Sequence, residues 1–130
     1  MNRPEQDLQI AIMNHYRARR VPGVFGFHVP NAGRRSMYVG KKLKEAGLTP
    51  GVHDLVFIRM GKTFMLEVKD TNGRLSKAQE NVHAAVKDAG AESAVADNLD
   101  EALITLECWG IIKRDSNHRV PEASQGTQGA

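Results

Sequence analysis

The sequence lacks the features that are typical of secreted and membrane-spanning proteins. It has one cysteine, Cys108, which excludes an internal disulfide framework and a zinc site built from cysteines. No apolar run approaches the ~20 residues that a helix needs to span a bilayer. Residues 1–7 contain no apolar stretch of the kind that begins a secretory signal. We therefore expect a cytoplasmic protein.

Several common catalytic motifs are absent as well. The sequence contains no GxGxxG fingerprint and no Walker phosphate-binding loop, so we expect no small-molecule cofactor. It shows no Ser-His-Asp order and no internal repeats. What remains is a chain of 130 residues, 41% hydrophobic and 25% charged, which is the composition of one globular domain.

The net charge of +3 is distributed unevenly. Residues 1–50 contain nine Lys and Arg against three Asp and Glu, whereas residues 51–130 contain nine against twelve. A basic half beside a more acidic half fits a polyanion that one part holds and the other part cuts. A solvated basic surface explains the same distribution, and charge alone favours that simpler interpretation.

Two short apolar segments carry charged residues at one end. Residues 50–59 (P-G-V-H-D-L-V-F-I-R) and 63–69 (T-F-M-L-E-V-K) have the composition of strands that are covered on both faces. Asp54 opens the first strand, and Glu67 and Lys69 close the second. Ionised groups at the edge of a core cost several kcal/mol unless they are paired, hydrogen-bonded or bound to a metal. The three residues therefore indicate a functional site.

The turn between these strands decides how the charged residues meet. Met60-Gly61 or Gly61-Lys62 predicts a tight antiparallel hairpin. The first turn places Asp54 opposite Glu67, and the second places it opposite Lys69. Either register leaves the two carboxylates roughly 5–8 Å apart at their Cβ atoms. Glu67 and Lys69 share one face of their strand, so we expect two acids and one ammonium group in a small pocket.

The rest of the sequence predicts an α/β fold, a small mixed β-sheet flanked by helices. Hydrophobic periodicity and capping residues predict helices over residues 5–20, 36–46, 76–89 and 99–112, and strands over residues 24–29 and 92–96. Residues 116–130 have almost nothing to bury and are predicted to form a disordered tail. The predicted domain therefore covers residues 1–115.

Two polar residues of the predicted helices have a structural and a functional interpretation. Glu5 lies on the same side of the first helix as Leu8 and Ile12, so it either favours the helix dipole or reaches the site as a third acid. Gln79 is the third residue after Ser76, the N-cap of a capping box, which explains it without any catalytic role.

The predicted pocket suits metal-dependent hydrolysis. Two neighbouring carboxylates repel each other, and one normally takes up a proton unless a divalent cation accepts both as ligands. Mg²⁺ and Mn²⁺ prefer such oxygen ligands and are commonly shared with substrate phosphates. Lys69 is placed to orient or deprotonate an attacking water, or to neutralise charge that develops on phosphorus.

These residues resemble a known nuclease signature. Asp54 with Glu67-Val68-Lys69 is similar to the PD-(D/E)XK motif. More narrowly, the chain resembles the virus-type replication-repair nuclease (VRR-NUC) domain over about residues 5–106. The similar segments are H-V-P-N-A-G-R-R, G-K-K-L-K-E-A-G-L-T-P-G-V-H-D-L, L-E-V-K and G-R-L-S-K-A-Q. The resemblance implies a restriction-endonuclease-like core and a divalent-metal-dependent DNA endonuclease.

The resemblance also implies roles for individual residues. It implies Asp54, Glu67 and the backbone carbonyl of Val68 as ligands of Mg²⁺, for which Mn²⁺ would substitute. It implies Lys69 in the position that activates water. Glu5 would then be a supporting acid and Gln79 a polar group at the rim.

The implied substrate is structured DNA, with branched four-way (Holliday) junctions as the leading candidate. A homodimer acting in DNA repair in a bacterial or phage-infected cell is also implied, and its two-fold axis would suit symmetric nicking of two strands. The basic half of the chain supplies the predicted DNA contacts: Asn31, Arg34, Arg35, Lys41, Lys42 and Lys44. Turn formation and solvation explain the same residues. The alternative functions are a non-catalytic DNA-binding module of the same fold and a domain with no DNA role.

One position departs from the family pattern. The family usually has proline directly before the first acid, whereas this sequence has His53. An extended backbone there is accessible to histidine, so we expect little effect on the site. We predict a loop histidine that faces solvent, with a phosphate contact or an extra metal ligand as alternatives.

Overall fold

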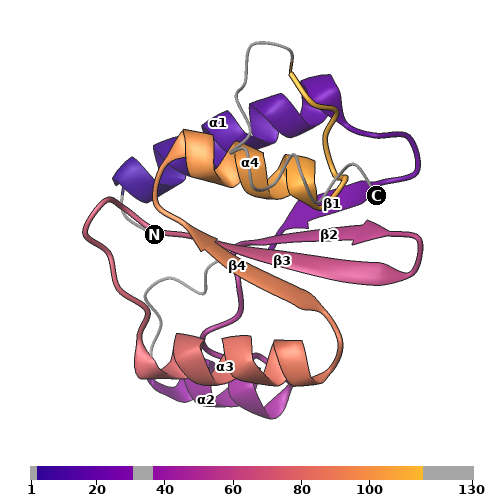
Figure 1. Cartoon of the computed structure of the whole chain (residues 1–130). Helices are drawn as coiled ribbons and strands as arrows, with labels where there is room; N and C mark the ends of the chain where they lie inside the picture. The colour runs from indigo at the N-terminus through magenta and orange to yellow at the C-terminus, as the bar shows by residue number, and fades with distance from the viewer. Residues whose placement is uncertain (1–2, 31–36, 116–130) are drawn as a thin grey trace.

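The structure is a computed structural model, and it describes residues 3–30 and 37–115. The predicted tail over residues 116–130 lies outside the described residues. The elements follow the predicted order (Figure 1). They are α1 (Arg3–Arg19), β1 (Phe25–His28), α2 (Met37–Glu45), β2 (Leu55–Arg59), β3 (Lys62–Val68), α3 (Lys77–Asp88), β4 (Glu92–Ala96) and α4 (Leu99–Cys108).

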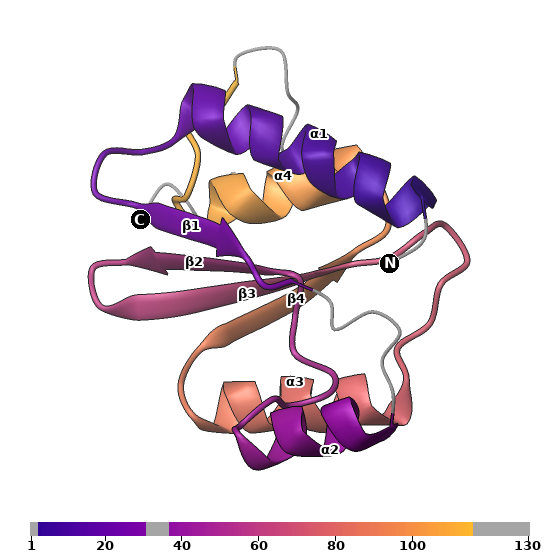
Figure 2. The same ribbon diagram turned by 180° about the vertical axis from the view of Figure 1, so that it is seen from behind.

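The four strands form one mixed sheet in the order β1-β2-β3-β4. β1, β2 and β3 pair antiparallel, and β4 pairs parallel with β3. Helices α1 and α4 cover one face of the sheet, and α2 and α3 lie on the side of the other face (Figures 1 and 2). The predicted α/β class is confirmed. None of the described helices is long and apolar enough to cross a membrane.

The β2–β3 hairpin turns at Met60-Gly61. Arg59 pairs with Lys62, and both turn residues have positive φ angles, 51° and 78°. Such a turn matches the right-handed twist of the flanking strands, and glycine at the second position adopts it without strain. The first of the two registers considered above is therefore correct, and the Gly61-Lys62 turn is wrong.

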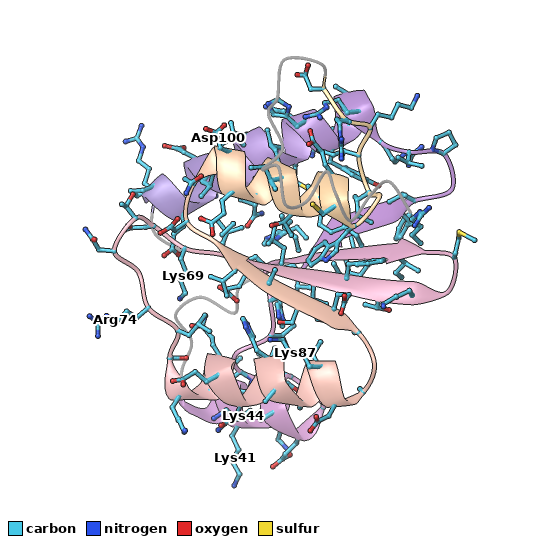
Figure 3. All side chains as sticks on the ribbon, viewed as in Figure 1. Lys41, Lys44, Lys69, Arg74, Lys87 and Asp100 are labelled. Carbon is cyan, nitrogen blue, oxygen red and sulfur yellow. The ribbon has the colours of Figure 1, made fainter. Side chains whose placement is uncertain are left out.

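The polar and apolar faces of β3 follow from strand alternation. Phe64, Leu66 and Val68 point into the core, which leaves Glu67 on the opposite face, the side of α3. Lys69 follows directly after the strand, and its side chain lies on the α3 side of the sheet (Figure 3). The hairpin thus directs apolar groups to one layer and charged groups to the other.

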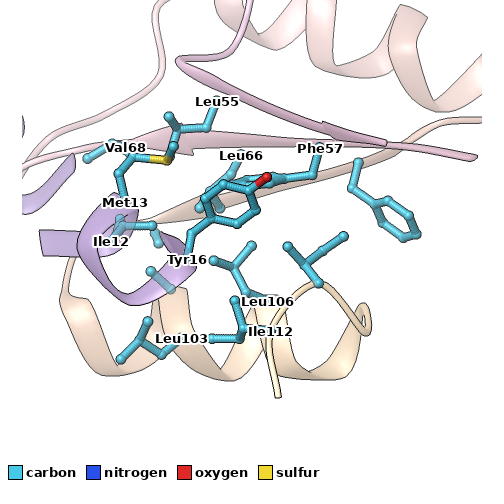
Figure 4. Close-up of a cluster of buried hydrophobic side chains, with 14 of the residues drawn as sticks. Ile12, Met13, Tyr16, Leu55, Phe57, Leu66, Val68, Leu103, Leu106 and Ile112 are labelled. Carbon is cyan, nitrogen blue, oxygen red and sulfur yellow. The ribbon is translucent and has the colours of Figure 1, made fainter. Parts of the chain in front are cut away.

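The hydrophobic core fills the space between the sheet and the helices α1 and α4. Phe57 of β2 and Leu66 of β3 are fully buried, and they face Tyr16 of α1 and Leu106 of α4 across the core (Figure 4). The Tyr16 and Phe57 rings are tilted with their centroids 5.4 Å apart. This one-sided core fixes the sheet and leaves its other face available for polar side chains.

Two predicted boundaries are corrected. The last helix ends at Cys108 instead of residue 112, because Trp109 caps it and Gly110 takes a φ of 77° that breaks the helical path. The first strand of the hairpin begins at Leu55, so residues 50–54 form a loop that leads into it. Strand β4 has the predicted bounds.

Candidate active site

The two carboxylates of the site meet at the open end of the hairpin. Leu55 pairs with Leu66, so the register carried one residue further brings Asp54 opposite Glu67. The Oδ2 atom of Asp54 accepts a hydrogen bond of 2.8 Å from the backbone N–H of Val68. This bond holds the Asp54 side chain against the end of β3. Glu67 is only 3% exposed.

The close approach of these acids changes the protonation of Glu67. Burial is the main cause that raises the pKa of Glu67 to about 9, followed by the negative charge of Asp54, a hydrogen bond with the Asp54 carboxyl, and the charge of Glu5. The positive charge of Lys69 acts in the opposite direction. At neutral pH the metal-free pair therefore carries a proton.

Gln79 forms the predicted capping box and also contacts the acid pair, while its functional role stays a prediction. Its backbone N–H and side-chain Oε1 form the capping box with Ser76, at 3.1 and 2.9 Å. Its Nε2 atom donates a hydrogen bond of 3.3 Å to Oε2 of Glu67. The cap thus fixes the start of α3 and directs the remaining amide group toward the acid pair.

Glu5 lies in the first turn of α1 and also reaches the site. Its Oε2 atom accepts a hydrogen bond of 3.3 Å from the backbone N–H of Asp70, which follows Lys69. Its charge contributes to the raised pKa of Glu67. Glu5 therefore lies within electrostatic reach of the acid pair, and its role as a supporting acid stays a prediction.

Lys69 is placed by the end of the sheet. Its backbone N–H donates to the carbonyl of Ala96 at 2.9 Å, which continues the β3–β4 pairing by one residue. The side chain is half-buried. Its charge influences Glu67 and His83, so the ammonium group belongs to the same electrostatic cluster as the acids.

The predicted DNA contacts fall into two sets. Lys41, Lys42 and Lys44 are exposed on α2, and Lys42 forms an ion pair of 3.6 Å with Glu45. Lys41 extends from the molecule on the side away from the sheet (Figure 3). The other predicted contacts lie outside the described residues: Asn31, Arg34 and Arg35.

The prediction that His53 faces solvent is wrong, because its side chain is fully buried. The loop that carries it packs against the first turn of α3. A Cβ atom at Gly51 would lie 2.6 Å from the Ala78 carbonyl, so only glycine permits this approach. The Nε2 atom of His53 shares a hydrogen bond of 2.6 Å with the Ser93 hydroxyl. Burial, and then the charge of His83, lower the pKa of His53 to about 4.

His83 is a site residue that the sequence analysis did not identify. It lies on α3, is 7% exposed, and its Nε2 atom is 3.7 Å from Oε1 of Glu67. Burial, followed by the charges of Lys87 and Lys69, lowers its pKa. The available signal was spacing, because a residue four positions after Gln79 lies on the same face of a helix.

The residues present fit a divalent cation of the Mg²⁺ class. Within residues 3–30 and 37–115, no group of three or more His, Cys, Asp and Glu side chains is arranged to hold a metal ion. Mg²⁺ does not require one, since it commonly uses one or two carboxylates together with water and substrate phosphate. Oε1 of Glu67 is buried without a hydrogen-bond partner, and a cation beside Asp54 would satisfy it.

Comparison with known proteins agrees with this arrangement at the level of the fold. A solved structure described as a VRR_NUC domain protein superposes with a TM-score of 0.68 at 18% identity, over 88% of this chain and 99% of that chain. The chain has the VRR-NUC fold. A second structure, described as a VRR_NUC domain, superposes with a TM-score of 0.55 at 21% identity, over 80% of this chain and 95% of that chain.

The evidence for the VRR-NUC fold comes from structure alone. No protein-family model matches the sequence, and a search of curated proteins finds no match. The overlap spans nearly the full length of both VRR-NUC structures, so the chain matches a whole domain of that type.

Proposed function

We propose that this chain is a divalent-metal-dependent DNA endonuclease that hydrolyses phosphodiester bonds. The observation that carries the proposal is the buried Glu67 paired with the half-buried Asp54, with Lys69 beside them, at the end of the hairpin of a VRR-NUC fold. A buried carboxylate such as Glu67, whose pKa is raised by burial and by a neighbouring acid, is costly for stability. Such a pair is typical of a site that binds a cation.

The residues of the pair would hold the cation. Asp54, Glu67 and the backbone carbonyl of Val68 are the proposed ligands, with Mg²⁺ as the cation and Mn²⁺ as a substitute. When bound, the cation supplies Lewis-acid stabilisation of the phosphoryl oxygen and lowers the pKa of water. The proton on the acid pair would leave when the cation binds, because carboxylates ligate in the ionised form.

The other side chains would prepare the attack. Lys69 would orient the attacking water or take its proton, and its ammonium group would counter the charge that develops on phosphorus. Gln79 would hold Oε2 of Glu67 through the bond that the structure describes. Glu5 would contribute negative charge and position the segment after Lys69 through Asp70.

The proposed substrate is branched DNA, with four-way junctions as the first candidate. The support for it is the sequence resemblance described above together with the basic N-terminal half of the chain. Lys41, Lys42 and Lys44 would contact phosphates without reading sequence. A general electrostatic attraction of this kind weakens steeply as salt is added.

We also propose a homodimer. β1 is an edge strand of the sheet, and the rings of Phe25 and Phe27 on it are 60% and 38% exposed. An open edge with apolar side chains favours pairing with another chain, and a second copy is the occupant that the resemblance implies. Sedimentation of the wild type and of Phe25→Glu tests this, with the mutant expected to be monomeric if the edge forms the interface.

The experiment that tests the endonuclease is cleavage of a labelled four-way junction in Mg²⁺, Mn²⁺ or EDTA. Linear duplex, flap and single-stranded DNA are the substrate controls. Glu67→Gln removes the ligand charge, and Glu92→Gln is the matched control because Glu92 is an exposed acid on the neighbouring strand. Metal-dependent cutting that only Glu67→Gln abolishes supports the proposal.

The second candidate function is a non-catalytic DNA-binding module of the same fold. The exposed lysines of α2 are compatible with it, but a module that only binds has no need of carboxylates near phosphate. Salt-sensitive binding without cutting in either metal would establish this alternative. A protein that neither binds nor cuts DNA would reject both functions.

A further inference from the structure

The α3 side of Glu67 contains a pair of buried histidines that the proposed mechanism does not use. His83 and His53 stack with their ring centroids 3.7 Å apart and an interplanar angle of 14°. His53 is fully buried, and His83 is 7% exposed. Buried polar rings need partners, so the contacts of each nitrogen show what the pair does.

The outer nitrogen of His83 is directed at Glu67. Its Nε2 atom lies 3.7 Å from Oε1 of Glu67. Both atoms are buried, and neither has a hydrogen-bond partner among the residues that the structure describes. The other oxygen of the same carboxylate accepts from Gln79 at 3.3 Å. Two residues one helical turn apart on α3 thus face the two oxygens of a single carboxylate.

His53 supports this arrangement from behind. Its ring packs flat against His83, and its Nε2 atom shares a hydrogen bond of 2.6 Å with the hydroxyl of Ser93 on β4. His53 also directly precedes Asp54 in the chain. The stacked pair therefore connects the backbone next to one acid with the side chain of the other.

We infer that His83 is a positioning residue that holds Oε1 of Glu67 in the orientation required for metal binding, with His53 as its support. The inference rests on the proposed metal-dependent function. Groups that orient a metal ligand commonly change metal affinity by about 10–100-fold when they are removed. His83 is assigned to orient the ligand and not to bind the metal itself, because its Nε2 atom faces Oε1 of Glu67.

The test measures binding of Mn²⁺ alone to the full-length protein, from the free Mn²⁺ signal in electron paramagnetic resonance. His83→Leu removes the nitrogen and keeps an apolar side chain of moderate size. We expect its dissociation constant to rise about 10–100-fold. His83→Gln should restore most of the affinity, because an amide at this position can still reach Oε1. His15→Leu is the matched control, since His15 lies on α1 and contacts Arg19.

A second pair of variants covers the case in which His83→Leu does not fold. His83→Asn and His83→Gln are both polar, but only the longer glutamine reaches Glu67. Weaker Mn²⁺ binding by the asparagine variant than by the glutamine variant supports the inference. Equal affinity in both, at the wild-type level, would overturn it.

Three results separate the inference from the function on which it rests. Wild-type protein that binds no Mn²⁺ would overturn the metal site itself, and the inference with it. Wild-type binding that His83→Leu leaves unchanged would overturn the inference alone. Spin-echo modulation from a directly coordinated imidazole nitrogen, lost in His83→Leu, would show that His83 is a ligand and would also overturn the positioning role.

Discussion

The two faces of the sheet differ in the kind of side chain that the same strands place on them. On the side of α1 and α4, β2 and β3 contribute the buried apolar residues Phe57 and Leu66. On the side of α3, β3 contributes Glu67, which meets Gln79 and His83. Apolar packing tolerates variation in side chains of similar volume, whereas a buried carboxylate requires particular partners at particular atoms. One strand therefore presents packed apolar residues on one face and a buried carboxylate with specific polar partners on the other.

Removing a charge from the acid pair should have the largest effect on function. Asp54→Asn or Glu67→Gln should reduce junction cleavage below detection, because each loses a proposed metal ligand. DNA binding should stay near the wild-type level or become tighter, since less negative charge faces the phosphates. Gel-based cleavage and fluorescence anisotropy measure the two effects. Cleavage retained in both variants would reject the assignment.

Substitution of Lys69 tests whether the charged face of the sheet affects the reaction rate or only DNA binding. Lys69→Ala should slow single-turnover cleavage by about 10²-fold or more, with a smaller loss of binding. Lys62→Ala is the matched control, because Lys62 is an exposed lysine at the other end of β3. A larger effect on binding than on the cleavage rate would make Lys69 a phosphate contact only.

The apolar face should show the reverse pattern. Leu66→Ala should lower the free energy of unfolding by about 2–5 kcal/mol, because the fully buried side chain leaves a cavity. Cleavage per folded molecule should change little at a temperature where the variant is folded. Denaturant unfolding measures the stability, and the half-exposed Val95→Ala on β4 provides a control with a much smaller cost. A variant that is stable but inactive would mean that the two faces are coupled.

The last prediction concerns pH. The pKa of Glu67 is about 9 in the folded protein and 4.5 in the unfolded chain, so the folded state holds a proton that the unfolded state has released. Stability that is present below pH 4.5 should therefore decline as the pH rises toward 9 in metal-free protein. Thermal unfolding across this range measures the decline, and Glu67→Gln should flatten it relative to Glu92→Gln. Identical profiles in the two variants would show that Glu67 titrates normally.

The order of the elements and the acid pair were predictable because they depend on local patterns. Alternation along residues 63–69 separates Glu67 from Leu66 and Val68, and the Ser76 capping box marks the start of α3. The choice between two hairpin registers was not predictable, since both turns contain Gly61. The two pairings differ by two residues along β3, so both keep the same side chains on the core face, and strand alternation cannot choose between them.

The local sequence pattern did not predict that His53 and His83 are buried. His53 lies in a polar loop, and loops are exposed by default. Its burial follows from the approach of Gly51 to the backbone of Ala78, two segments that are distant in the sequence. His83 shares the spacing of Gln79, but only the packing of α3 on the sheet brings it to Glu67.

The sequence by itself determined the helices, the strands and the acids that close the hairpin, because periodicity, caps and turn residues act over a few positions. Tertiary structure alone decided the register, the burial of His53 and the contacts of Glu67 with Gln79 and His83. These features depend on the close approach of segments that are far apart in the chain. Desolvation and pairing, which set the chemistry of a buried carboxylate, exist only after that approach.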